Sequence, residues 1–225
     1  MRNLLIPVSL AFFSLGAAGL GSSTSTISQL PDGTLSGNVY SNDALGLSYE
    51  FPSSWMATPD PKGPVNLDGR KPDEPANRCS KVLLSLQAPR QTEGRFASIA
   101  TVFAIDPTCF PGAEFPHSLE ERNKIRKIAD KIIGPFSHTP YFSPYGVTIS
   151  ALNSQGRVLI QLTGGVIINA VEGRPAPAKE PLKVNTSFTF TESKGYWVVW
   201  AYLADDPSTE ELKNSKVVFK DDPLH

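Results

Sequence analysis

The chain is poor in the residues that usually bind metals. Its 225 residues include only three histidines: His117, His138 and His225. A zinc site needs three or four ligands. His117 and Glu121 follow part of a His-x-x-Glu-His pattern, but Glu121 stands where the second histidine would be. We interpret Glu121 as a helix-capping residue and expect no metal and no cofactor.

Net charge is almost absent. The 21 Lys and Arg residues balance 22 Asp and Glu residues, giving a formal charge of -1. A nucleic-acid-binding domain normally carries a basic excess, so this composition excludes nucleic acid as the expected partner. Five basic residues do gather in one predicted helix, but they spread over more than one of its faces. This pattern favours a solvated surface over an anion or membrane site. They are Arg122, Lys124, Arg126, Lys127 and Lys131.

Catalytic motifs are missing as well. A nucleophile elbow requires Gly-x-Ser-x-Gly, whereas the residues around Ser154 read Leu152-Asn-Ser-Gln-Gly156 and indicate a turn. No phosphate-binding loop or dinucleotide fingerprint occurs in the chain, and Gly164-Gly165 alone is a weak signal. We therefore expect a domain that binds something without transforming it.

The one long apolar run lies at the N-terminus. Leu4 to Leu20 follows Arg2, contains the small residues Gly16-Ala17-Ala18, and is followed by serines and threonines. This order is typical of a secretory signal peptide, predicted here over 1–21. An uncleaved anchor helix is the alternative, although the run is short for one and ends in glycines. After cleavage we expect no membrane span and a secreted or periplasmic location.

The only two cysteines, Cys79 and Cys109, are expected to form a disulfide. An isolated pair in an oxidising compartment usually does so, and a loop of this length adds about 3 to 4 kcal/mol in the chain-entropy account. Reactive thiols are the alternative, but the Cys-x-x-Cys spacing that favours them is absent.

Periodicity and turn residues predict a mostly β domain over 37–225, preceded by a flexible leader over 22–36. Hairpins are predicted around the turn at 42–46 and around 153–156, with further strands at 81–87, 96–105 and 184–191. A capping box at Ser118 and Glu121 predicts a helix over 119–133, and a second one predicts a short helix from Ser208. Proline-rich loops are expected at 58–78 and 169–182.

The segment Tyr196 to Leu203 is apolar at every position. A strand that is apolar on both sides must lie in the middle of a sheet covered on both faces. Trp197 and Trp200 are then predicted to be buried on opposite faces.

Four aromatic residues lie within ten positions of a predicted proline-rich loop: Phe136, Tyr141, Phe142 and Tyr145. Such residues can form the lip of a ligand site, since tyrosine offers both flat area and a hydroxyl. Capping of the core edge is the alternative that we favour.

Three segments together resemble the PsbP-like superfamily, which includes the extrinsic photosystem II subunit and DcrB-like exported proteins. They are Tyr40 to Trp55, the closing strand Gly195 to Trp200, and Ser208 to Phe219. The resemblance implies an α+β fold with an antiparallel sheet of about six to eight strands, covered on both faces by helices and long loops. It covers the two ends of the chain, and it implies a fold better than a role.

These features together predict an exported, noncatalytic binding or accessory domain of the cell envelope. The expected partner is an unknown protein or a small apolar ligand. A secreted hydrolase with scattered polar residues and a purely structural envelope component are the alternatives.

Overall fold

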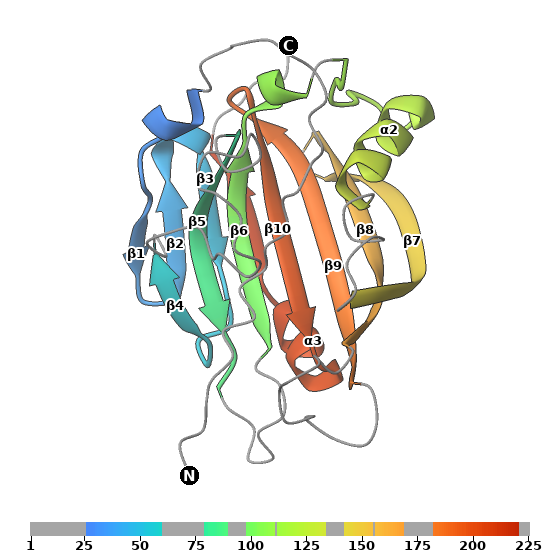
Figure 1. Cartoon of the computed structure of the whole chain (residues 1–225). Coiled ribbons are helices and arrows are strands. Elements are labelled where there is room, and N and C mark those ends of the chain that lie inside the picture. Colours follow the sequence, from blue (N-terminus) through green and yellow to red (C-terminus); the bar gives the residue numbers. More distant parts are fainter. Residues whose placement is uncertain are drawn as a thin grey trace.

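The computed structural model describes residues 26–59, 79–89, 98–110, 112–133, 142–154, 156–168 and 182–220. The predicted signal peptide and the proline-rich segments 60–78 and 169–181 lie outside these ranges. The described residues form two antiparallel sheets (Figure 1).

The large sheet has seven strands in the spatial order β4-β5-β6-β10-β9-β8-β7. Their bounds are β4 Met56–Pro59, β5 Ser80–Gln87, β6 Ile99–Ile105, β7 Phe142–Ser154, β8 Arg157–Ile168, β9 Leu182–Ser193 and β10 Tyr196–Ala204. The small sheet has the order β1-β2-β3-β11, with β1 Thr34–Ser36, β2 Val39–Asn42, β3 Leu47–Glu50 and β11 Lys216–Phe219. The helical segments are η1 Thr26–Gln29, η2 Asp43–Leu45, η3 Pro107–Cys109, α2 Arg122–Ile133 and α3 Asp206–Leu212.

Strand β10 is the middle strand of the large sheet, as predicted. Trp197, Val199, Ala201 and Leu203 belong to one hydrophobic cluster, with Ile125 and Ile128 of α2. Val198 and Ala204 belong to a second cluster, against which Trp200 packs from the same side. The two indole rings therefore lie on opposite faces, and successive residues of the strand point alternately to the two cores.

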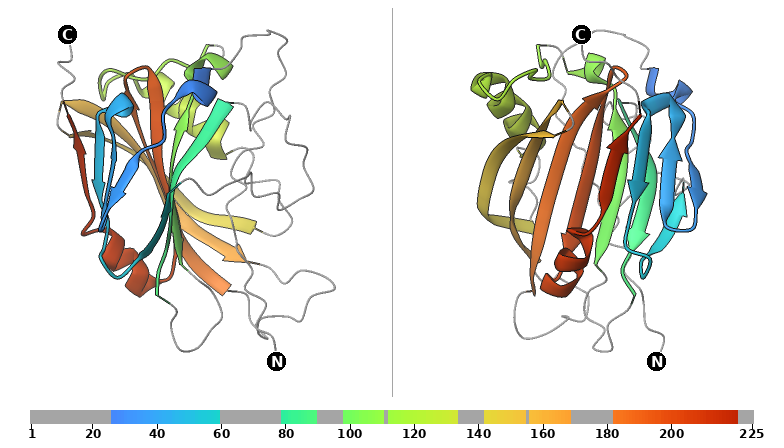
Figure 2. Two further views of the ribbon diagram at one scale, coloured as in Figure 1. Left: turned by 90° about the vertical axis from the view of Figure 1, so that its left-hand side faces the viewer. Right: turned by 180° about the vertical axis from the view of Figure 1, so that it is seen from behind.

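The cover of the sheet differs from the expectation of helices and long loops on both faces. Helix α2 lies over one face, whereas the second cluster is formed mainly with residues of the small sheet, including Tyr40, Leu47 and Tyr49. Short α3 adds Leu212 on this side (Figure 2). The sequence did predict the β2–β3 hairpin, but its alternating residues do not say that the hairpin would pack face to face on the large sheet.

Secondary structure begins nearer the N-terminus than predicted, within the segment 22–36 that was expected to be a flexible leader. From Thr26 onward this segment forms η1 and β1, and Ile27 and Leu30 are buried in the second cluster. Two apolar side chains among serines and threonines are enough to attach this segment, because each removes its surface from water.

Both helices begin elsewhere than their capping boxes predicted. Helix α2 starts at Arg122, and the Glu121 carboxylate accepts hydrogen bonds from the backbone N–H groups of His117 (2.6 Å) and Ser118 (3.3 Å). Helix α3 starts at Asp206, because the Asp205 side chain caps it by accepting from the Ser208 N–H. Asp is among the best N-cap residues and displaces the expected serine.

The turn between β2 and β3 is built as its sequence predicts. Asn42 Oδ1 accepts from the Leu45 N–H at 3.2 Å, and Gly46 takes a positive φ of 60°. A Cβ atom at Gly46 would approach the carbonyl oxygen of Lys220 to 2.6 Å, so glycine is required there for two reasons.

Candidate binding surface

The face of β7, β8 and β9 that points to the same side as the small sheet carries uncharged polar side chains. In one row Ser150 is opposite Gln161, which is opposite Thr189, which is opposite Trp200 of β10. In the next row Thr148, Thr163 and Ser187 face one another in the same way. We call the six residues of these three strands the polar half-face: Thr148, Ser150, Gln161, Thr163, Ser187 and Thr189.

The small sheet covers only the other half of this side. The second hydrophobic cluster contains no residue of β7, β8 or β9. Seen from behind, β7 and β8 extend beyond the small sheet (Figure 2). Thr148 and Ser150 are exposed, Gln161, Thr163 and Thr189 are half-buried, and Ser187 is buried. The exposure of the polar half-face therefore decreases from β7, at the edge of the sheet, toward β9.

Aromatic side chains mark the border between the covered half and the polar half-face. The half-buried ring of Trp200 meets Tyr49 and Phe219 edge-on, with centroid distances of 6.5 and 5.9 Å. The guanidinium group of Arg157 lies 4.5 Å from the ring centroid of Phe219, and its Nη1 donates to the Glu192 carbonyl at 2.6 Å. Burial raises the pKa of the neighbouring Tyr202 hydroxyl, so that group remains a neutral hydrogen-bonding partner.

Charge is nearly absent from this part of the molecule. Arg157 is the only charged residue between Phe142 and Ile168, and there is none between Val184 and Thr191. The centres of protein–protein interfaces are depleted of charged residues and enriched in aromatic ones. The arrangement can accept and donate hydrogen bonds to an uncharged surface.

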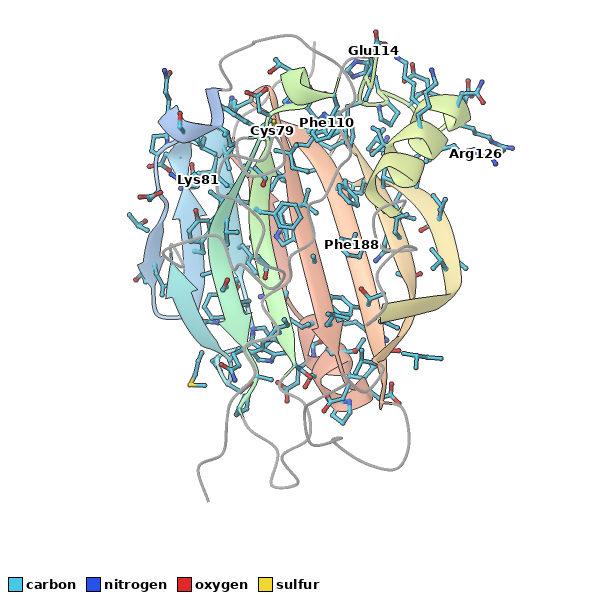
Figure 3. The ribbon with its side chains drawn as sticks, in the orientation of Figure 1. Cys79, Lys81, Phe110, Glu114, Arg126 and Phe188 are labelled. Atoms are coloured by element: carbon cyan, nitrogen blue, oxygen red, sulfur yellow. The ribbon has the colours of Figure 1, made fainter. Side chains whose placement is uncertain are left out.

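A separate pocket lies beside the start of α2. Gly112, Glu114, Lys124 and Lys127 line a pocket of about 160 Å³. Lys124 Nζ lies 3.1 Å from Glu114 Oε2 and 2.7 Å from Glu121 Oε1. Mainly through its bond to Lys124, and then through the His117 N–H, the pKa of Glu121 falls from 4.5 to about 2. Lys124 is thus paired with two carboxylates, at the end of the molecule where Figure 3 labels Glu114.

Of the three histidines that were considered as metal ligands, the structure describes only His117. It is exposed, and its backbone N–H serves the Glu121 carboxylate, which is the capping role expected for that glutamate. His138 and His225 lie outside the described residues. Within the described ranges, no three metal-ligating side chains come together.

The predicted aromatic lip is only partly described. Phe136 and Tyr141 lie outside the described residues, and so do the side chains of Phe142 and Tyr145. The backbone of the last two was expected in a loop and belongs instead to β7, opposite Ile168 and Gly165. Pro144 lies in the same strand, which is compatible with its position at the edge of the sheet, where a missing N–H costs no ladder bond.

Ser154 and the two cysteines lie at chain turns. Ser154 ends β7 opposite Arg157, in the hairpin that the sequence predicted. Cys79 is buried at the start of β5 (Figure 3), and its carbonyl accepts from the Asp106 N–H at 2.8 Å. Asp106 precedes Cys109 by three residues, so the backbone brings the two cysteine-bearing segments together. The disulfide itself stays a prediction.

Comparisons with known proteins give a structural likeness to a solved structure. The chain matches no protein-family model and no curated protein. Its structure is similar to the solution structure of cyanobacterial PsbP (CyanoP) from Synechocystis sp. PCC 6803, with a TM-score of 0.46 and 10% sequence identity. The match covers 81% of this chain and 89% of that chain. This likeness concerns the course of the backbone alone. Among the residues described, no helix is both long and apolar enough to cross a membrane.

Proposed function

We propose that this chain is an exported, noncatalytic binding or accessory domain of the cell envelope, and that its polar half-face binds a protein partner. The apolar run and the serine- and threonine-rich segment at the N-terminus support export. The observation that carries the binding role is that the small sheet covers half of one side of the large sheet and leaves the polar half-face beside it.

The composition of this surface supports a protein partner over a small apolar ligand. The accessible side chains among its six residues are hydroxyls and an amide, Leu152 of β7 is exposed on the same face, and Trp200 is half-buried at the border. Aromatic residues combined with polar side chains and little charge are typical of protein–protein contacts. An apolar ligand would offer no hydrogen bonds to the Ser150 hydroxyl and the Gln161 amide, which costs free energy.

A charge placed at the inner border of the polar half-face tests the binding role. Thr189→Arg puts a guanidinium beside Trp200, and Thr34→Arg on exposed β1 is the matched control. Immobilised wild type and both variants are exposed to envelope proteins of the source cells, and retained proteins are identified by mass spectrometry. We expect a protein retained by wild type and Thr34→Arg but lost with Thr189→Arg. Equal retention by all three, or no retained protein, would overturn the proposal.

Export has its own test. The intact mass of protein recovered from the periplasm or the medium should correspond to a chain that begins between Gly19 and Ser23. Recovery from the cytosol with Met1 retained would contradict export and leave the binding test unaffected.

A further inference from the structure

The two sheets have four edge strands, and three of them are short or protected. β1 has only three residues, β4 has four residues and ends in Pro59, and β11 has four residues that begin with Lys216. Short length, proline and lysine are common devices that prevent an edge strand from pairing with another chain. These three edges are therefore poor templates for a further strand.

The fourth edge strand, β7, lacks these devices over half its length. It spans Phe142–Ser154, and its proline and its register shift, between Tyr145 and Thr148, lie in the first half. From Thr148 to Ser154 the pairing with β8 is regular and no residue is charged. These seven residues exceed the typical strand length of about 5 to 6. Figure 1 shows β7 at the outer edge of the large sheet.

Apolar side chains are also accessible on this strand. Val147, Ile149 and Leu152 are 40%, 44% and 51% exposed. Ile149 is opposite Leu162 of the first hydrophobic cluster. Leu152 is an odd number of positions away from Ile149, so it points to the other face of the sheet. The strand thus presents accessible apolar groups on both sides of its open edge.

We propose that this edge binds a second copy of the chain, with Thr148–Ser154 of each copy pairing antiparallel about a two-fold axis. This inference does not depend on the binding role of the polar half-face. The two seven-stranded sheets then form one continuous sheet, in which the open backbone groups of β7 find partners.

Charge is the reason why a second copy fits. Two-fold pairing places a segment opposite itself, and like charges directly opposite one another destabilise a sheet. The segment Thr148–Ser154 carries no charge, so no like charges oppose one another when it pairs with a second copy of itself. Because antiparallel partners share a face, Ile149 and Leu152 gain neighbours on their own sides of the sheet, and the polar half-faces of the two copies become adjacent.

The mass of the chain in solution tests this proposal. Light scattering during size exclusion, at micromolar concentrations, should give twice the mass of one chain for the wild type. Ser150→Lys, next to the centre of the segment, should give the mass of a single chain with unchanged circular dichroism and melting. The matched control Ser36→Lys, on the exposed edge strand β1, should remain a dimer. The proposal would be overturned if the wild type had the mass of a single chain at every concentration up to its solubility limit.

A second measurement locates the contact even if Ser150→Lys fails to fold. Ala151→Cys, which two-fold pairing of Thr148–Ser154 places opposite itself, should cross-link under mild oxidation and run at double mass on a non-reducing gel, whereas Ser36→Cys should not. A wild-type dimer that survives Ser150→Lys, or cross-linking at Ser36→Cys alone, would place the contact elsewhere and refute the role of β7. Neither result bears on partner retention by Thr189→Arg.

Discussion

Truncation of the two tryptophans of β10 measures how each face of the large sheet is covered. Trp197 is 2% exposed, and its indole stacks on Phe110 at 5.6 Å with a further contact to Phe115 at 6.2 Å. A buried tryptophan removes up to about 250 Å² from water, which at about 25 cal/mol per Å² is roughly 6 kcal/mol. Residual burial in the unfolded chain lowers this by about 10 to 40%. We therefore expect Trp197→Ala to lower the free energy of unfolding by about 4 kcal/mol.

Trp200 is expected to cost less, although the sequence suggests an equal loss. Its side chain is half-buried, so only part of its area leaves water on folding. Its indole Nε1 is buried and makes no hydrogen bond, which already costs about 1 to 3 kcal/mol in the native state. We expect about 2 kcal/mol for Trp200→Ala. Trp200→Phe keeps a ring beside Tyr49 and Phe219 and removes the unpaired N–H, so it should stay within about 1 kcal/mol of wild type.

Urea unfolding at 25 °C, followed by far-UV circular dichroism, gives these values without relying on the fluorescence that the variants change. The slope of the unfolding free energy with urea must stay constant for the comparison to hold. A loss below about 1 kcal/mol for Trp197→Ala would refute the cover of that face by Phe110, Phe115 and α2. A larger loss for Trp200→Ala than for Trp197→Ala would refute the reasoning about the unpaired indole.

Two further predictions concern the cysteines and Glu121. Thiol titration of the unfolded, unreduced chain should find no free thiol if Cys79 and Cys109 are bridged, and two thiols with unchanged stability after reduction would contradict the bridge. The Glu121 carboxylate should titrate near pH 2 by carbon-13 NMR. Its folded pKa lies below the unfolded value of 4.5, so its contribution to stability is complete above about pH 4.5 and is lost as the pH falls toward 2. Lys124→Met should raise this midpoint toward 4.5, whereas Lys127→Met should not, and equal midpoints in both variants would contradict the assignment.

Local patterns predicted the parts of the fold that depend on neighbours in the chain. The turn at Asn42 and Gly46, the hairpin at Ser154 and the central position of Tyr196 to Leu203 follow from turn residues and periodicity. The start of α3 was misplaced because two candidate caps, Asp205 and Ser208, compete within four residues. Glu211, which was expected in a capping box, instead accepts from Ser54 Oγ (2.9 Å) and Trp55 Nε1 (3.0 Å) on a distant turn.

The candidate surface could be predicted only in part. The alternation over 184–191 does indicate a strand with one polar side, but it does not show which strands lie beside it. The polar half-face exists because Thr189 lies between Gln161 and Trp200, and this register places β8 beside the β9–β10 hairpin, which local patterns do not predict. The small sheet determines how much of this side is covered, and its last strand, β11, comes from the C-terminal end of the described chain.

The position of that last strand has a consequence for the order of folding. β11 pairs with β3, and the Tyr49 hydroxyl donates to Ser215 Oγ across 166 residues of sequence. Contacts of such high sequence separation are slow to form, because a long loop must close before they contribute. The small sheet is therefore completed only after the C-terminal residues have been synthesised, and until then the apolar side of β5, β6 and β10 lacks part of its cover. A chain that emerges from its N-terminus thus stays incompletely folded until its last strand arrives.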